Sequence, residues 1–141
     1  MSDRLLRSAL AALCAAGAGV TAYLLSVRWG SVELYCTTGG CETVQSSSYA
    51  ELLGIPVAAA GFVAYLVLGA SAFFTAPLVR VAAAAIALAA VGFSVYLLAV
   101  QLWVIDAICI WCVASDVIVT LVAVVALLRL RGLFRRAAPA V

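Results

Sequence analysis

Four long stretches without a charged side chain alternate with short polar segments along the chain. They cover residues 8–27, 52–79, 81–105 and 107–128, the last interrupted only by Asp116. A helix of about 20 apolar residues crosses the hydrocarbon core of a bilayer, so each stretch is long enough for one crossing. We therefore predict an all-α membrane protein, a bundle of four transmembrane helices in a single domain of residues 1–141. The predicted spans cover about 8–28, 55–76, 80–101 and 107–129.

Composition agrees with a membrane location. The chain is 68% apolar and 10% charged, with a mean hydropathy of +1.27. A soluble domain of this length exposes too much of its surface to water to carry such a composition. The net charge of +2 comes from arginines between the apolar runs, which form no basic patch. We therefore expect a lipid bilayer and no nucleic acid among the partners.

The arginines also predict an orientation. Arg4 and Arg7 precede the first stretch, Arg80 lies in the second connection, and four more arginines follow the last stretch, whereas only Arg28 lies on the other side. Cytoplasmic loops carry the excess of basic residues. We expect a multi-pass protein of the plasma (inner) membrane with both termini cytoplasmic. The apolar run continues to Val27, which favours a retained helix over a cleaved signal peptide.

The connections are short apart from one extracytoplasmic loop, residues 29–53. Within it, Ser46–Gly54 is predicted to form a short interfacial helix, because Ser48 and Glu51 have capping-box spacing and glycine suits a helix end. Pro77 with Arg80 predicts a tight turn after the second span. Residues 101–106 predict another turn after the third.

Candidate chemistry lies in the cysteines, because the chain has no histidine and no lysine. Cys36 and Cys41 enclose two glycines that let the chain turn for a disulfide. Cys109-Ile-Trp-Cys112 is a C-x-x-C motif at the extracytoplasmic start of the fourth span. Asp106 is a plausible N-cap there, which places Cys109 in the first helical turn, where a thiolate is stabilised.

Three interpretations of the two pairs remain open. They are two structural disulfides, a zinc site built from four thiolates, or a redox relay. A C-x-x-C disulfide closes a very small loop and gains little entropy, so spacing and placement favour the redox relay. Such a relay at the bilayer edge needs an electron acceptor that lipid can supply, for which a quinone is suited. Cys14 lies near the cytoplasmic end and is predicted to be a packing residue.

Further motifs occur in a specific order around the cysteines. They are Cys36-x4-Cys41, Val44-Gln45-Ser46-Ser47-Ser48-Tyr49, Gly54-Ile-Pro56, Gly61, Tyr65, Ser94-Val-Tyr-Leu97, Asp106 and Cys109-Ile-Trp-Cys112. With this ordered set the chain resembles the bacterial branch of the vitamin K epoxide reductase family from the first span to the fourth.

The resemblance implies a four-helix bundle around a quinone pocket, with menaquinone or ubiquinone as the cofactor. It implies that Cys36 exchanges with a partner protein, that Cys41 bridges to Cys109, and that Cys112 lies nearest the quinone. Ser47 is implied to donate a hydrogen bond near the active site. Many bacterial members carry a fused thioredoxin-like domain. This sequence shows none, so we expect a separate DsbA-like thioredoxin-fold partner.

Two residues around the C-x-x-C motif are candidates for contact with the quinone. Asp116 lies four residues after Cys112 and seven after Cys109, so the three share a helical face. A carboxyl inside a span indicates function by default, and the alternative is a helix-packing hydrogen bond from a neutral acid. Trp111 is either a second quinone contact or an interface residue, as Trp29, Tyr35 and Trp103 are predicted to be.

The predicted function is a thiol:quinone oxidoreductase that reoxidises an extracytoplasmic disulfide carrier. The alternative within the family is reduction of vitamin K quinone or its epoxide. Gln45 and Val57 stand where animal members carry an aromatic residue and an asparagine, a departure from the pattern for epoxide chemistry. A four-span enzyme of the DsbB type carries its C-x-x-C near the second span, unlike this chain. A non-catalytic membrane subunit with stapled loops is the alternative outside the enzymes.

Overall fold

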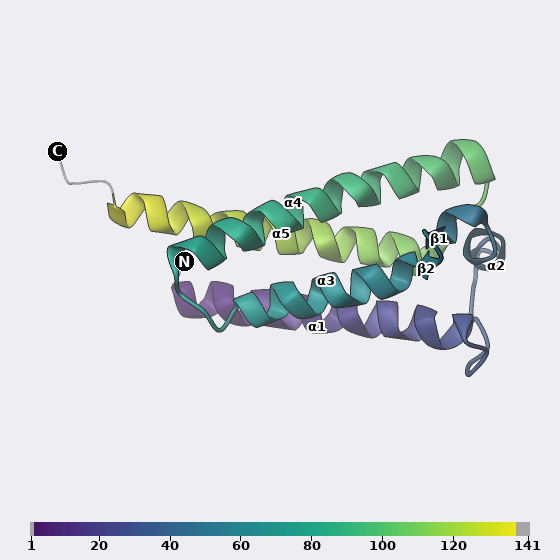
Figure 1. The fold of residues 1–141 in the computed structure, drawn as a ribbon, viewed down its shortest axis with the longest axis horizontal. Coiled ribbons are helices and arrows are strands. Elements are labelled where there is room, and N and C mark those ends of the chain that lie inside the picture. The colour runs from purple at the N-terminus through teal and green to yellow at the C-terminus, as the bar shows by residue number, and fades with distance from the viewer. Residues whose placement is uncertain (1, 138–141) are drawn as a thin grey trace.

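Four helices form an antiparallel bundle in the computed structural model, which describes residues 2–137. The ends of the predicted domain 1–141 lie outside the described residues. The helices are α1 (Asp3–Arg28), α3 (Val57–Ser71), α4 (Pro77–Val100) and α5 (Ile110–Ala137). In Figure 1, α1 and α3 form one pair and α4 and α5 the other, and α1 also packs against α5. The first turn of α1, the α3–α4 connection and the last turns of α5 lie at one end.

Local sequence explains where the helices begin. The Ser2 side chain accepts the N–H of Leu5 at 3.4 Å and caps α1. Asp3 in the first turn and Arg28 in the last both complement the helix dipole. Pro77 occupies the first turn of α4, where its missing N–H breaks no hydrogen bond. The predicted turn at Pro77 is thus wrong, because the proline starts the helix.

Three helical segments are long and apolar enough to cross a membrane. They cover Asp3–Arg28, Pro77–Ile105 and Ile110–Arg135. The segment Pro77–Ile105 is longer than the predicted third span because α4 continues without a break into a π-helix, η2 (Gln101–Ile105), at the position of the predicted turn. The segment α3 is apolar but has only 15 residues, which is shorter than the predicted span of 55–76. The prediction of a helical membrane bundle is confirmed in this form.

Arginines bind the backbone where α3 ends. Arg129, only 2% exposed, donates to the carbonyls of Ser71 at 3.4 Å and Phe74 at 3.2 Å. Arg7 donates to the carbonyl of Ala72 at 2.6 Å. The last carbonyls of a helix have no partner within it, and arginines can supply one. Arg80 donates to the carbonyl of Arg129 at 3.3 Å, which completes the cluster at this end.

The loop between α1 and α3 differs from the prediction. The short helix is α2 (Cys41–Gln45), and it precedes the predicted segment. Residues 46–54 contain instead a 3-10 turn, η1 (Ser48–Ala50), and the strand β1 (Glu51–Leu52), which pairs antiparallel with β2 (Ile55–Pro56). Leu53 and Gly54 between the strands have φ of 54° and 80°, so the chain reverses there instead of continuing a helix. The predicted interfacial helix over 46–54 is therefore wrong.

The core of the bundle lies between the helix pairs, away from the loop. It contains buried residues of all four helices, among them Leu10, Tyr65, Ala87 and Val122. Cys14 belongs to this cluster and is 2% exposed, so its predicted role in packing is confirmed. A second, smaller cluster surrounds the remaining cysteines at the other end of the molecule.

Candidate active site

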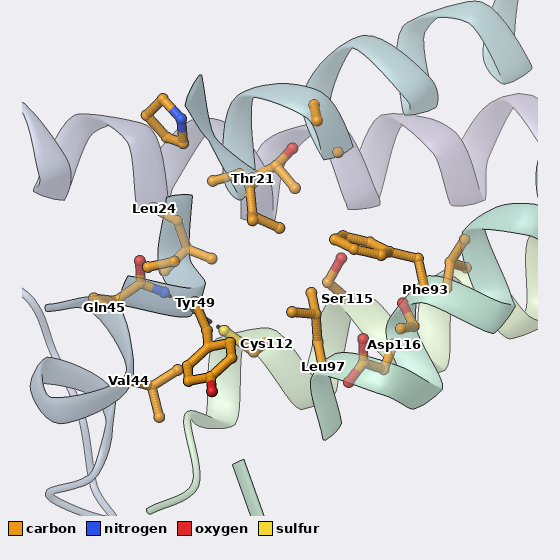
Figure 2. A pocket seen from close by; sticks show the side chains of 18 of the residues that line it. Thr21, Leu24, Val44, Gln45, Tyr49, Phe93, Leu97, Cys112, Ser115 and Asp116 are labelled. Atoms are coloured by element: carbon orange, nitrogen blue, oxygen red, sulfur yellow. Dashed lines mark hydrogen bonds between the residues drawn. The ribbon is translucent and has the colours of Figure 1, made fainter. Parts of the chain in front are cut away.

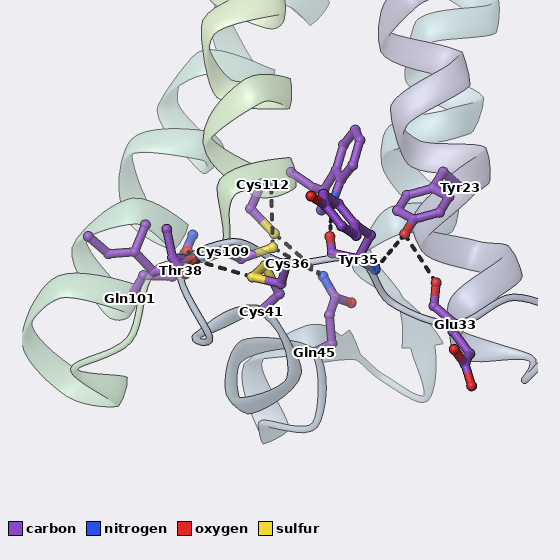
Figure 3. Close-up of a disulfide and its surroundings, with 12 residues drawn as sticks. Tyr23, Glu33, Tyr35, Cys36, Thr38, Cys41, Gln45, Gln101, Cys109 and Cys112 are labelled. Carbon is purple, nitrogen blue, oxygen red and sulfur yellow. Dashed lines mark hydrogen bonds between the residues drawn. A yellow bond between two sulfur atoms is a disulfide. The ribbon is translucent and has the colours of Figure 1, made fainter.

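The two cysteine pairs lie against each other and differ in redox state. Cys36 and Cys41 form a disulfide with their Cα atoms 6.0 Å apart, whereas Cys109 and Cys112 are free thiols. Cys41 and Cys109 are both fully buried in the same small cluster (Figure 3). The disulfide takes two of the four thiolates that a zinc site would need. One cysteine of each pair therefore belongs to the same buried cluster.

Cys109 immediately precedes α5 and caps it. Its sulfur accepts the N–H of Cys112 at 3.4 Å, and its carbonyl accepts the N–H of Val113 at 3.0 Å. Its own N–H donates to the buried side chain of Gln101 at 2.8 Å. Asp106, predicted as the N-cap, instead ends the π-helix with a left-handed φ of 53°. The predicted N-cap is therefore wrong by three residues. The side chain of Gln101 and the sulfur of Cys109 accept the backbone N–H groups at the start of the helix.

This position stabilises a thiolate on Cys109. Its pKa is lowered to about 6, chiefly because the side chain of Cys112 donates a hydrogen bond to it. Burial opposes this effect, and the N–H of Cys112 and the amide of Gln45 add to it. A thiolate is the reactive form in thiol–disulfide exchange. Cys109 is thus prepared to act as a nucleophile.

Polar contacts fix the disulfide loop on the start of α5. Thr38 donates to the carbonyl of Ile108 at 3.1 Å and lies 3.3 Å from the sulfur of Cys36. A Cβ added at Gly40 would lie 2.6 Å from the same Ile108 carbonyl oxygen. Only a residue without a side chain permits this approach. The loop and the C-x-x-C motif are therefore in direct backbone contact.

Aromatic side chains hold the segment that leads into Cys36. The indole N–H of Trp111 donates to the carbonyl of Tyr35 at 2.7 Å. The Tyr23 hydroxyl accepts the N–H of Tyr35 at 2.9 Å and donates to the carbonyl of Glu33 at 3.2 Å. The rings of Tyr23 and Trp111 lie 4.8 Å apart. These contacts tie residues 33–35 to both α1 and α5 (Figure 3).

A cavity of about 280 Å³ opens beside the second thiol. Its walls come from all four helices and from the loop, and most of them are apolar. The polar or aromatic lining residues labelled in Figure 2 are Thr21, Gln45, Tyr49, Phe93, Cys112, Ser115 and Asp116. Cys112 lines this cavity, whereas Cys109 does not. The two sulfurs of the motif therefore face different neighbours.

The two thiols differ in how far the protein buries them. The sequence places Cys109 nearer the membrane surface than Cys112, and in the structure Cys109 precedes α5 while Cys112 lies in its first turn. Cys109 is fully buried under α2, and Cys112 is the partly exposed one. Cys36 is only half-buried at the molecular surface. Access from outside therefore leads to Cys36, and access from the cavity leads to Cys112.

Asp116 and Ser47 both line the cavity. Asp116 lies on the same face as Cys112, and its buried Oδ2 atom has no hydrogen-bond partner among residues 2–137. The neighbouring Ser115 lies 3.0 Å from the hydroxyl of Tyr65. Ser47 donates to the carbonyl of Val44 at 2.7 Å. Their binding of a ligand stays a prediction.

Trp111 does not line the cavity, and its side chain contacts the loop.

The site residues that were not predicted from the sequence are Gln45, Gln101 and Tyr23. Gln101 carries a detectable signal, since it is a polar residue at the end of an apolar run. Gln45 stands inside the family motif, but nothing in the sequence indicates its contact with the thiols. Tyr23 carries no signal, because its contacts depend on how the loop folds back over the bundle.

A membrane helix bundle with a surface disulfide, a buried thiol pair and an adjoining cavity defines an oxidoreductase that works through cysteines. The sequence model of the vitamin K epoxide reductase family matches residues 8–127. The chain belongs to this family. The resemblance noted in the sequence is therefore confirmed over most of the length.

Proposed function

We propose that this chain is a membrane thiol:quinone oxidoreductase that oxidises an extracytoplasmic DsbA-like thioredoxin-fold protein. The observation that carries the proposal is the division between the two thiols. Cys109 packs with Cys41 of the loop disulfide, and Cys112 faces an apolar cavity. This arrangement suits a chain of exchanges that begins at Cys36 and ends in the cavity.

The cavity fits a quinone head group on its own features. A small-molecule site is mostly apolar, with a few polar groups that fix orientation. Gln45, Ser115 and Asp116 are such groups here, and within the described part of the chain the Oδ2 atom of Asp116 lacks a hydrogen-bond partner. A bound quinone would supply an acceptor for two electrons and two protons. Cys112, Asp116 and Ser47 would hold it, and whether it is menaquinone or ubiquinone is left to experiment.

The cysteines act in an order that follows from their exposure. A thiolate of the partner attacks Cys36, and the partner leaves oxidised while Cys36 and Cys41 become thiols. The Cys41 thiolate then attacks Cys109 of an oxidised membrane pair, and the Cys112 sulfur leaves as a thiolate. Attack by Cys36 on Cys41 restores the loop disulfide and leaves Cys109 and Cys112 reduced. The structure has this last combination, a closed loop pair and an open membrane pair.

The two protons needed to reduce a quinone come from side chains at the cavity. The membrane pair, as thiolate and thiol, supplies one proton and two electrons when it closes to a disulfide. The carboxyl of Asp116 supplies the second proton, because it lines the same cavity as Cys112 and its buried Oδ2 atom has no hydrogen-bond partner among the described residues. General acid catalysis by such a group contributes about 10²–10⁴-fold.

We also propose four crossings with both termini cytoplasmic in the plasma membrane. The arginines around the end of α3 gather at one end of the bundle, which the positive-inside rule assigns to the cytoplasm. Trp29 and Trp103, 71% and 81% exposed, lie at the other end and suit a membrane interface. The 15 residues of α3 span about 22 Å, less than the roughly 30 Å core. Arg7 and Arg129 satisfy the carbonyls of the connection that completes this crossing.

Complementation tests the function in cells. Single Cys→Ser variants are expressed in a bacterium that lacks its disulfide-forming membrane enzyme. We expect serine at Cys36, Cys41, Cys109 or Cys112 to abolish disulfide formation, and serine at Cys14 to leave it intact. Full activity of Cys109→Ser, or none of Cys14→Ser, would sink the assignment. Assay with a quinone epoxide distinguishes the other family activity, for which the apolar Val57 offers the cavity no hydrogen-bond donor.

A further inference from the structure

The amide of Gln45 reaches both sulfurs of the C-x-x-C pair. Its Nε2 atom lies 3.5 Å from the sulfur of Cys112 and 3.9 Å from that of Cys109. Figure 3 shows the side chain pointing from α2 toward the two thiols. An amide nitrogen carries two N–H groups and can donate to two acceptors. Among the described residues, no side chain other than Gln45 and the two cysteines themselves has a hydrogen bond to these sulfurs.

We propose that Gln45 is a catalytic hydrogen-bond donor that stabilises the negative charge of the pair as it passes between Cys109 and Cys112. The inference rests on the proposed function and deepens it. Negative charge must reside on Cys109 when it acts as a nucleophile, and on Cys112 when Cys41 attacks Cys109 and Cys112 leaves. A donor within reach of both sulfurs serves both states without moving the backbone.

The step is balanced with a quinone as the oxidant. A bond forms between the sulfurs of Cys109 and Cys112, and their two electrons pass to the quinone. The thiol proton of the pair and one proton from Asp116 complete the quinol. Gln45 neither gains nor loses a proton in this step, since it only donates hydrogen bonds. Its contribution is therefore to the stability of the thiolate, not to the proton count.

The position of Gln45 is fixed from two directions. Its backbone carbonyl accepts a hydrogen bond from Arg28 of α1 at 2.9 Å, and Arg28 also pairs with Glu51 of β1. At the other end of α2 lies Cys41, held by the disulfide. The same short helix thus carries the buried sulfur of the loop pair and the amide that contacts the membrane pair. Opening of the loop disulfide is expected to leave the Arg28 contact in place.

Other charged and titratable groups near Cys109 and Cys112 could also affect a pH titration of the two thiols. Those that line the cavity are Arg28, Tyr49, Tyr65, Cys112 and Asp116. Cys109 lies behind Cys112, and Glu51 is paired with Arg28. Replacement of Gln45 by methionine changes none of them, so the difference between this variant and wild type reports the loss of the amide. Replacement by glutamate removes the amide and also adds one titratable carboxyl group.

Gln45→Met and Gln45→Glu test the proposal in the full-length protein. Methionine keeps the length without a donor, and ionised glutamate adds a like charge. The readout is the thiolate absorbance of the reduced protein as a function of pH. Each titration is repeated with Cys109 also replaced by serine, and the difference between the two curves is the signal of Cys109. Glu42→Gln on the exposed side of α2 is the matched control. This titration needs neither quinone nor partner.

We expect the midpoint to rise by about one pH unit in Gln45→Met, a tenfold loss in ionisation, and further in Gln45→Glu. Quinone reduction should fall roughly 10- to 100-fold, as expected for loss of a hydrogen bond to a charged group. A purely structural role would not produce this order of midpoints. Unchanged midpoints in both variants overturn the proposal, and if Gln45→Met does not fold, an unchanged Gln45→Glu overturns it alone. If the midpoints shift as expected but the wild-type protein does not reduce quinone, the role of Gln45 as a hydrogen-bond donor stands and the proposed function is refuted.

Discussion

The sulfur of Cys109 accepts the backbone N–H of Cys112 at 3.4 Å, so the first cysteine of the motif caps the helix that carries the second. A negatively charged acceptor at a helix N-terminus is favoured by the helix dipole. The charge on Cys109 is therefore stabilised by a helix that lines the cavity with Cys112 and Asp116. The chemistry of both thiols depends on this one helix start.

The first prediction concerns the pH at which Cys109 ionises. We expect a midpoint near pH 6, because the pKa of Cys109 is lowered to about 6, chiefly by the side chain of Cys112. The thiolate is then present above this pH and is lost as the pH falls through it. Cys112→Ala should raise the midpoint, since it removes the largest favourable contact. Ultraviolet thiolate absorbance checks both values, and a wild-type midpoint at the ordinary thiol value of about 8.5 would contradict them.

The second prediction is a disulfide between Cys41 and Cys109 as the transfer intermediate. Both sulfurs are fully buried in one cluster, and each belongs to a different pair. Replacing Cys36 and Cys112 together with serine removes the two competing partners and should trap this bond. Peptide mapping by mass spectrometry identifies it, with Cys14→Ser added as a control for unrelated pairing. Recovery of Cys41 only as a free thiol or bonded to other molecules would count against the relay.

The third prediction tests the backbone contact between the loop and α5. Gly40→Ala adds a Cβ at 2.6 Å from the carbonyl oxygen of Ile108, so the loop must move away. We expect transfer between the pairs to slow at least tenfold, about 1.4 kcal/mol in barrier, while the disulfide with Cys36 still forms. Rapid-quench thiol trapping measures the transfer. Thr37→Ala, an exposed change in the same loop, serves as the control, and equal rates in both variants would show that the contact is dispensable.

The fourth prediction concerns Asp116. Asparagine keeps the shape but cannot supply a proton, so Asp116→Asn should slow quinone reduction by about 10²–10⁴-fold. Exchange between Cys36 and the partner should be unchanged, because it takes place at the other side of the loop pair. Val117→Ala, an exposed neighbour, is the control. Wild-type turnover in Asp116→Asn, or loss of folded protein, would reassign the residue to helix packing.

The fifth prediction concerns the stability of the bundle. Arg129→Met leaves the carbonyls of Ser71 and Phe74 without their buried donor, at a cost of about 1–3 kcal/mol for each group. Arg131→Met removes the same charge from an exposed position and should change little. Unfolding in detergent measures both variants. Equal stabilities would show that water or lipid satisfies these carbonyls equally well.

Much of this arrangement can be predicted from the sequence, because the thickness of the bilayer sets the length of the helices and the chemistry of the thiols sets the spacing of the cysteines. Apolar runs predict the helices, and the interval of four residues places Asp116 on the face of Cys112. The same geometry excludes Trp111 from the face of α5 that carries Cys112, since a helix turns about 100° between neighbouring residues. Its indole therefore points to the loop.

The loop itself could not be predicted in the same way. Residues 41–56 form a five-residue helix, a 3-10 turn and a two-stranded hairpin, none of which is stable in isolation. Arg28 decides their arrangement by binding the Gln45 carbonyl and the Glu51 side chain. The disulfide and the Gly40 contact add constraints that come from outside the segment. Local signals such as the spacing of Ser48 and Glu51 are overridden by them.

The most direct test of the account is anaerobic quinone reduction by the purified protein with a reduced DsbA-like partner as the only electron donor. Absorbance follows the quinone, and thiol trapping follows the partner in the same reaction. We predict one quinone reduced for each partner disulfide formed, with no reduction by Cys36→Ser and undiminished reduction by Cys14→Ser. Oxidation of the partner without quinone reduction, or quinone reduction that persists in Cys112→Ser, would contradict the relay from Cys36 to the cavity.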